Sequence, residues 1–144
     1  MYLIDTNVVS EARKKDGSNP GVIGFFDRVV ASSEPVYLSV VSIGELRRGI
    51  ELVRHRGDSR QAERLEAWLT VVLDQYGDHI LAFDGDAAQV WGRLRVPNPG
   101  HELDKQIAAI ALVNDLTVVT RNIADFKSTG VKLVNPFLPA TDEL

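Results

Sequence analysis

The sequence predicts an α/β fold built on a parallel sheet that helices cover on both faces. Short apolar runs alternate along the chain with longer segments of helical pattern. The apolar runs lack the polar alternation of a half-exposed strand, which favours strands that are buried on both sides. Strands that alternate with helices indicate βα units and a parallel sheet. In such sheets ligands bind beyond the carboxyl ends of the strands, so the residues that follow each strand are candidates for chemistry.

Five apolar runs are predicted as strands, in chain order Tyr2–Ile4, Val36–Leu38, Ile80–Phe83, Thr117–Thr120 and Val131–Val134. We expect the fourth of these to be a central strand, entered through a tight turn at Asp115 and Leu116. The last strand ends at Asn135-Pro136, because proline cannot donate a hydrogen bond to a ladder.

Helical patterns between these runs predict helices over 20–31, 42–56, 59–75, 85–96 and 104–115. Pro20 is well placed to open the first helix after the loop Gly17-Ser18-Asn19. The segment 97–100, Pro-Asn-Pro-Gly, is a helix-breaking sequence that separates the last two helices. The spacing of one buried helical face is clearest in the third helix, in Leu65, Trp68, Leu69 and Val72.

Length and composition fit one domain, with 144 residues, 44% apolar and 25% charged. We expect this domain to span residues 1–137 and residues 138–144 to be a tail without an apolar run. The absence of cysteine excludes disulfides and thiolate metal sites. His55, His79 and His101 are scattered without metal-ligand spacing, so any metal is expected to be a hard cation held by oxygen.

The net charge of −4 argues against extensive binding to a nucleic-acid backbone, although it leaves room for a local basic patch. No basic region precedes an apolar stretch at the N-terminus, so no signal peptide is expected. The longest apolar stretch, 107–113, is too short to span a bilayer. These observations predict a soluble, cytoplasmic protein.

Asp5 and Glu45 are the first two acids that could carry chemistry. Asp5 directly follows the first strand, and its alternative role is to cap the helix that follows. Glu45 lies in the first turn of the predicted helix 42–56, where Ser42 and Glu45 have the spacing of a capping box. Glu45 could also pair with Arg48 three residues later.

Asp104 and Asp125 are the other two candidate acids. Asp104 could cap the helix that follows it, but Ile107 occupies the reciprocal capping-box position, so only half of that pattern is present. The alanine-rich sequence of this helix predicts close packing against the sheet. Asn122 and Asp125 follow the fourth strand, and one helical turn would place both on one side, although both also favour turns.

The candidate acids share one property, since each follows a strand or begins a helix that can face the strand ends. In a parallel sheet these ends lie at the same edge. Carboxylates that converge there raise one another's pKa, and a divalent cation removes the conflict. Such a site can activate water and polarise a phosphodiester. Metal-assisted hydrolysis is therefore the predicted reaction class.

Four stretches, in order along nearly the whole chain, carry a family resemblance: Leu3–Asn7, Glu45–Gly49, Asp104–Ala109 and Thr120–Phe126. Together they resemble PIN domains and, more narrowly, VapC toxins of bacterial type II toxin–antitoxin pairs in the FitB-like subgroup. The resemblance implies a single-domain, three-layer α/β/α sandwich and an Mg²⁺- or Mn²⁺-dependent endoribonuclease. It also implies homodimers, inhibition by a VapB-type antitoxin, further assembly with that antitoxin, and contact with operator DNA only through it.

The same resemblance assigns the metal-binding and catalytic roles to Asp5, Glu45, Asp104 and Asp125. Members of the family differ in the position of the fourth acid. Because Asn122 is an amide, we select Asp125 and keep Asn122 as a secondary ligand. Thr6 and Thr120 are candidates for hydrogen bonds that hold the ligands.

Basic residues cluster at Arg47, Arg48, Arg54, His55, Arg56, Arg60 and Arg64. We interpret most of them as a solvated helix face with Glu51, Asp58 and Glu63 as partners. Arg47 or Arg48, close to Glu45, could instead contact RNA phosphates or the antitoxin. The helix 59–75 and Trp91 are interpreted as core or dimer surface.

Other phosphate-handling families fit less well. A haloacid-dehalogenase-like phosphatase needs a second aspartate where this chain has Asn7, and a receiver domain needs a lysine where it has Arg121. The remaining alternative is a PIN-like partner that binds an antitoxin and its operator DNA without catalysis. Metal binding and the effect of Asp5→Asn would distinguish it from an enzyme.

Overall fold

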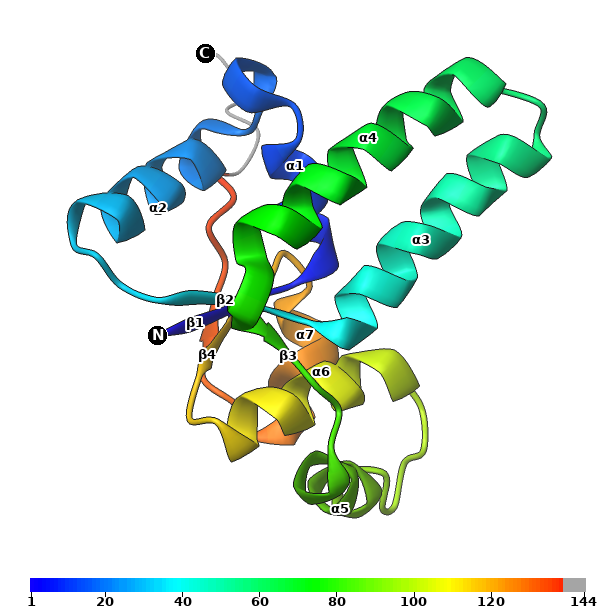
Figure 1. Ribbon diagram of the computed structural model, residues 1–144. Helices are drawn as coiled ribbons and strands as arrows, with labels where there is room; N and C mark the ends of the chain where they lie inside the picture. Colours follow the sequence, from blue (N-terminus) through cyan, green and yellow to red (C-terminus); the bar gives the residue numbers. More distant parts are fainter. Residues whose placement is uncertain (139–144) are drawn as a thin grey trace, which may run out of the picture.

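A computed structural model describes residues 1–138 of the chain (Figure 1). Except for its first residue, the predicted tail 138–144 lies outside the described residues, and the domain limits stay a prediction. The elements, in chain order, are β1 (Tyr2–Ile4), α1 (Thr6–Ala12), α2 (Pro20–Ala31), β2 (Val36–Ser39), α3 (Val40–His55), α4 (Ser59–Tyr76), β3 (Ile80–Leu81), α5 (Gly85–Leu94), α6 (Glu102–Val113), β4 (Thr117–Val119), α7 (Ile123–Phe126) and β5 (Leu133–Val134). Short 3-10 turns are η1 (Lys15–Gly17), η2 (Gly77–His79) and η3 (Lys127–Thr129).

The strands among residues 1–138 form one parallel sheet in the order β3-β2-β1-β4-β5. β1 is the middle strand, with Tyr2 opposite Val36 of β2 and Thr117 of β4. The predicted parallel sheet is confirmed, and the strand expected to be central, β4, is an interior strand beside β1. Because all these strands point the same way, their carboxyl ends lie along one edge.

Successive residues of the interior strands face two separate cores, one on each side of the sheet. Ile4 and Val119 pack with helices α1 to α4, whereas Leu3 and Val118 pack with α5 to α7. All four side chains are fully buried, which explains why the strand sequences show no polar alternation. The three-layer α/β/α arrangement is thereby confirmed.

The predicted helical ranges omit α1 and α7, which are too short to show a periodic apolar face. α1 contributes only Val8 and Val9 to the buried set, and α7 contributes only Phe126. The single turn expected over Asn122 and Asp125 is nevertheless present as α7. β3 and β5 are each shorter than the apolar runs that predicted them, since the ladder pairs only two residues of each.

Helices α3 and α4 form a hairpin whose connecting turn lies far from the sheet (Figure 1). Glu66 of α4 accepts from the two terminal guanidinium nitrogens of Arg47, at 2.5 and 3.1 Å, and from Arg54 at 3.0 Å. These two cations lower the pKa of Glu66 to about 2. Arg54 also pairs with Glu51 within α3. The ion pairs join exposed side chains, so they align the two helices more than they stabilise the fold.

The basic cluster of the sequence is therefore in part the paired helix face that we predicted. Of the expected partners, Glu51 is confirmed, but Asp58 caps α4 by accepting from the Gln61 amide at 3.1 Å. Glu63 makes no ion pair within residues 1–138. The chief partner is Glu66, which the sequence pattern did not single out. No helix in this part of the chain has both the length and the apolar character needed to cross a bilayer.

The start of α2 touches the last described residues so closely that Gly21 has no room for a side chain. A Cβ there would overlap the carbonyl oxygen of Pro136 and lie 2.7 Å from the amide nitrogen of Leu138. Asn19 holds this segment, because its side chain accepts from the Leu138 amide at 3.0 Å and donates to the Leu138 carbonyl at 3.1 Å.

We predict that Gly21→Ala lowers the free energy of unfolding by about 1–3 kcal/mol, the usual cost of overpacking. Gly49→Ala is the matched control, because a Cβ at Gly49 in α3 meets nothing within 4 Å. The control is expected to be neutral or to stabilise by up to about 1 kcal/mol through helix propensity. Urea unfolding of both variants measures the difference, and equal effects would contradict the close approach.

Candidate metal centre

Asp5 is the first residue after β1 and lies in the middle of the carboxyl edge of the sheet. Its side chain is 3% exposed. The Thr6 amide donates to Oδ1 at 2.8 Å, and the Thr120 hydroxyl and the Asn7 amide donate to Oδ2 at 2.7 and 3.3 Å. Burial raises the pKa of Asp5, and these three hydrogen bonds oppose that rise. Asp5 also occupies the N-cap position of α1, so the capping role foreseen for it is compatible with a ligand role.

Thr120 joins the ends of β1 and β4 at this point. The residue is fully buried, and its Oγ1 also accepts from the Asn122 amide at 3.0 Å. Asn7 completes the link, because its Oδ1 accepts from the Arg121 amide at 3.2 Å. The two strand ends are therefore fixed relative to each other by side chains as well as by the ladder.

Glu45 lies one turn further into α3 than the sequence predicted. The helix begins at Val40, and the N-cap is Ser39, whose Oγ accepts from the Ser42 amide at 3.1 Å. The predicted capping box of Ser42 and Glu45 is wrong, because Ser39 makes the cap three residues earlier. Glu45 is thus free of the local role that competed with metal binding.

Thr6 positions the Glu45 carboxylate. Its hydroxyl donates to Glu45 Oε1 at 2.9 Å and lies 3.0 Å from Ser42 Oγ. Burial and then the charge of Asp5 raise the pKa of Glu45. Arg48 forms no ion pair with Glu45 among the described residues, so the alternative pairing along α3 is also absent.

Asp104 does not cap its helix, contrary to the alternative considered from the sequence. α6 begins at Glu102, which makes Asp104 the third helical residue. Ala108, Ala109 and Ala111 are fully buried, and this confirms the predicted close packing of the small-sided helix. The pKa of Asp104 is raised to about 6, first by burial and then by the charges of the other three candidate acids, Asp5, Asp125 and Glu45.

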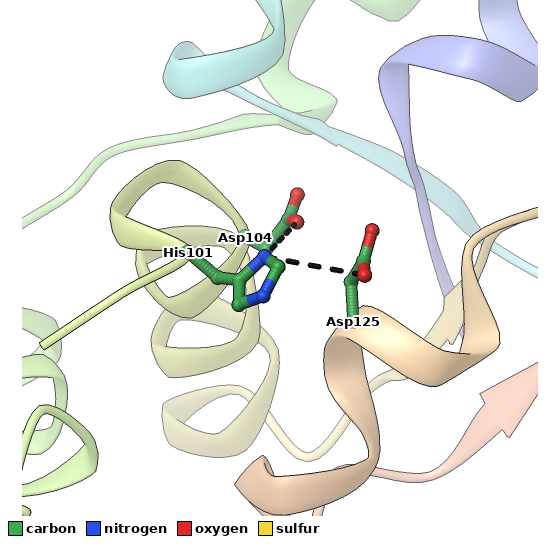
Figure 2. Close-up of side chains that lie close together, drawn as sticks. All are labelled: His101, Asp104 and Asp125. Atoms are coloured by element: carbon green, nitrogen blue, oxygen red, sulfur yellow. Dashed lines mark ion pairs between the residues drawn. The ribbon is translucent and has the colours of Figure 1, made fainter. Parts of the chain in front are cut away.

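Asp125 is the third residue of α7. It lies near His101, which also lies near Asp104. Its Oδ1 lies 4.0 Å from His101 Nδ1, and Asp104 Oδ2 lies 3.8 Å from the same nitrogen (Figure 2). Asn122 precedes α7, and its side chain makes no capping hydrogen bond. These positions favour Asp125 over Asn122 as the fourth acid.

His101 is the residue near the acids that the sequence reasoning missed. One donor atom from each of His101, Asp104 and Asp125 lies within 4.8 Å of the others. The one sequence signal was the spacing of three residues between His101 and Asp104. The helix-breaking sequence of residues 97–100 hid this signal, because it gave no reason to expect that α6 begins as early as residue 102.

The donor set fits a divalent cation. Burial raises the pKa values of Asp5, Asp104 and Glu45, and the charges of the other acids add to each rise. Such mutual repulsion is costly without a counter-charge. Carboxylate oxygens on four different elements that meet at one edge are the ligands that Mg²⁺ and Mn²⁺ prefer.

The remaining residues singled out in the sequence lie outside this cluster. Arg47 is tied to Glu66, whereas Arg48 is exposed. Trp91 belongs to the core on the α5–α7 side, where its indole nitrogen donates to the Glu102 carbonyl at 3.2 Å. The predicted buried face of α4 is confirmed at Leu69 and Val72.

Comparison with known families and proteins agrees with this geometry. The model of the PIN domain family matches residues 2–132. The plasmid stability protein StbB of Pseudomonas syringae pv. tomato is 35% identical, in an alignment that covers 95% of this chain and 99% of that protein. The toxin FitB of Neisseria gonorrhoeae is 34% identical, with the same coverage of 95% and 99%. The VapC ribonuclease Y4jK of Sinorhizobium fredii is 31% identical, with coverage of 97% and 100%.

Solved structures show the same fold. The crystal structure of FitAcB from Neisseria gonorrhoeae aligns with a TM-score of 0.75 and 33% identity over 94% of this chain and 98% of that one. The structure of FitAB bound to an IR36 DNA fragment aligns with a TM-score of 0.76 and 30% identity over 99% and 100% of the two chains.

We predict that the metal-free protein loses stability as the pH rises from about 4 to about 6. The pKa of Asp104 lies at about 6 in the folded state, against a usual value of 3.8. The folded state therefore holds the proton more tightly. The resulting stabilisation is fully present below the unfolded pKa and disappears as the pH rises through the folded pKa.

Urea unfolding in EDTA between pH 4 and pH 7 tests this sign. Asp104→Asn should flatten that part of the profile and raise the stability of the metal-free protein at pH 7, since it removes one of the repelling charges. Asp74→Asn, at an exposed position of α4, is the control and should leave the profile unchanged. A profile that Asp104→Asn does not alter would contradict the electrostatic coupling of the acids.

Proposed function

The chain belongs to the PIN domain family, and on that premise we propose that it is the toxin of a VapBC-type toxin–antitoxin pair and a metal-dependent endoribonuclease. The observation that carries this proposal is the convergence of Asp5, Glu45, Asp104 and Asp125 at one edge of the sheet. The name of the relative from Sinorhizobium fredii, a VapC ribonuclease, supports RNA as the substrate. The proposal includes a homodimer and a cytoplasmic location, where RNA is available.

The four acids would hold Mg²⁺ or Mn²⁺, and the chain's hydrogen bonds determine how rigidly each can do so. Asp5 is fixed by Thr6 and Thr120, and Glu45 is fixed by the Thr6 hydroxyl. Asp104 and Asp125 accept no side-chain hydrogen bond within the described residues, so they can adjust to the ion and to the scissile phosphate. When bound, the cation supplies a Lewis acid for the phosphodiester and lowers the pKa of water.

Recognition of RNA by this acidic protein requires only a local patch. Sequence-specific recognition of RNA usually targets single-stranded loops, whose few nucleotides need few contacts. Arg48 is exposed on α3 one turn beyond Glu45 and is available to a phosphate. Arg47 is engaged by Glu66, so of the two arginines we assign the RNA contact to Arg48.

We assign the antitoxin to an apolar groove on the face formed by α1, α2 and α4. The groove has a volume of about 390 Å³, and its walls include Phe26, Val30, Trp68 and Val72. Val30 is 77% exposed and belongs to the lining of this groove, so it extends a contiguous apolar surface of the kind that marks protein–protein interfaces. The solved relatives FitAcB and FitAB support a partner on this chain, since both names describe assemblies.

The groove continues toward the acids. A second depression, of about 210 Å³, has Thr6 and Glu45 in its wall. Arg13 and Trp68 line both depressions, and the Arg13 guanidinium lies 6.0 Å from the centre of the Trp68 ring. An extended or helical segment seated in the apolar groove can therefore reach Glu45 and block the site.

We predict that Asp5→Asn and Asp104→Asn lower RNA cleavage by roughly two orders of magnitude or more, because each removes a ligand charge from the metal site. The assay is cleavage of total RNA by pure protein with Mg²⁺ and with EDTA, followed by mapping of the new ends. Asp86→Asn is the matched control, since Asp86 lies in the first turn of α5 but outside the cluster. Cleavage by the wild type that survives EDTA, or by a pure Asp5→Asn protein, would leave a non-catalytic binding partner as the better description.

We predict that Val30→Glu weakens antitoxin binding at least about tenfold, because the new carboxylate must be desolvated in an apolar groove. Cleavage of RNA by the free protein should not change, since Val30 does not line the depression that contains Glu45. Co-purification with a co-expressed VapB-type antitoxin measures the first effect. Val113→Glu, at an exposed position of α6, is the control. Equal retention of the antitoxin by both variants would place its binding surface elsewhere.

A further inference from the structure

His101 is an exposed residue whose ring lies close to two carboxylates of the acid cluster. It occupies the position before α6 with φ 56° and ψ 49°, in the left-handed region. Figure 2 shows its ring between Asp104 of α6 and Asp125 of α7. The side chain is 53% exposed, so both solvent and an incoming ion can reach Nδ1.

The distances from His101 to the two carboxylates are too long for hydrogen bonds but suit groups that bind a common ion. Nδ1 lies 3.8 Å from Asp104 Oδ2 and 4.0 Å from Asp125 Oδ1, and both exceed the length of a hydrogen bond. Donor atoms about 2.1 Å from one cation can be separated by up to about 4.2 Å. Both separations from Nδ1 lie within this limit, and the donor atoms of all three residues lie within 4.8 Å of one another. Side-chain movements that draw the two carboxylates together would let the nitrogen and the two oxygens bind the same ion.

The loop that presents His101 is anchored on both sides. The Lys105 ammonium is buried and donates to the Asn98 carbonyl, and the Gly100 amide donates to the Asn98 side chain at 2.9 Å. Arg95 pairs with Glu102 at 3.1 Å, directly after His101. The position of the histidine is thus built into the fold, although its ring makes no hydrogen bond within the described residues.

We propose that His101 is a nitrogen ligand of the metal centre and that it biases the centre toward first-row transition-metal dications over Mg²⁺. The inference rests on the proposed function, because it takes the cluster of acids as a metal site. Imidazole suits ions such as Ni²⁺, Fe²⁺ and Zn²⁺, whereas carboxylate and water suit Mg²⁺. With His101 included, this chain offers a mixed nitrogen and oxygen donor set, whereas the scattered histidines of the sequence predicted oxygen ligands.

Metal binding by the tag-free protein, measured by calorimetry with Ni²⁺ and with Mg²⁺, tests the proposal. His101→Ala should raise the dissociation constant for Ni²⁺ about tenfold or more and that for Mg²⁺ less than about threefold. His55→Ala is the matched control, because His55 is an exposed histidine at the end of α3, and it should change neither constant. Because His101 is exposed and its ring makes no hydrogen bond among the described residues, its replacement removes neither buried packing nor a hydrogen bond from the fold.

An NMR measurement provides a readout that is independent of affinity. The imidazole resonances that disappear in His101→Ala identify the residue, and in the wild type substoichiometric Mn²⁺ should broaden these resonances before those of His55 and His79. Unequal broadening together with the selective loss of Ni²⁺ affinity supports the ligand role. Equal affinities in wild type and His101→Ala would overturn it, as would tighter binding in the variant, which would make His101 a competitor of the ion.

The two proposals can fail separately. A wild-type protein that binds neither Ni²⁺ nor Mg²⁺ contradicts the metal centre itself and the role of His101 with it. A wild-type protein that binds both ions, with affinities unaffected by His101→Ala, contradicts only the role of His101 and leaves the centre of four acids in place.

Discussion

The buried carboxylate of Asp5 is the constraint on which the rest of the site depends. A carboxylate so deeply buried is costly unless its oxygens accept hydrogen bonds, and both do. The donors come from the start of α1 and the end of β4, so satisfying Asp5 fixes two elements that are far apart in the sequence. The same Thr6 that binds Asp5 through its amide holds Glu45 through its hydroxyl, which carries the constraint to α3. The hydrogen bonds around Asp5 therefore position α1, the end of β4 and Glu45 relative to one another.

Bringing the four candidate acids together costs electrostatic free energy in the folded protein. The pKa of Asp104 is raised to about 6, first by burial of its carboxyl group and then by the neighbouring negative charges. A group held in this way lowers the stability of the metal-free protein at neutral pH. Such retained strain is a common property of sites that are prepared for a charged ligand. The hydrophobic cores on both faces of the sheet supply the stability that makes it tolerable.

The fold was largely predictable from the sequence because its signals are local and repetitive. Unalternating apolar runs predict strands buried on two faces, and the helical spacing of Leu69 and Val72 predicts which side of α4 is buried. Helix starts were less predictable, since two serines compete for the cap of α3 and the pattern does not show that Ser39 makes it. His101 was missed for a different reason. Its approach to Asp125 depends on a turn with positive φ that brings two distant segments together, and spacing along the chain does not encode that approach.

The four candidate acids come from both sides of the sheet, and the acids of each side have different neighbouring residues. Glu45 comes from the side of α1 to α4 and shares its surroundings with Arg13 and Trp68 of the groove. Asp104 and Asp125 come from the side of α6 and α7, where the groove does not extend. If a partner binds in this groove, as proposed, changes that alter its fit are confined to one layer, while Asp104 and Asp125 in the opposite layer stay unaltered. Under the proposed function, the surface that binds the inhibitor and the acids on the α6 and α7 side can therefore be altered independently of each other.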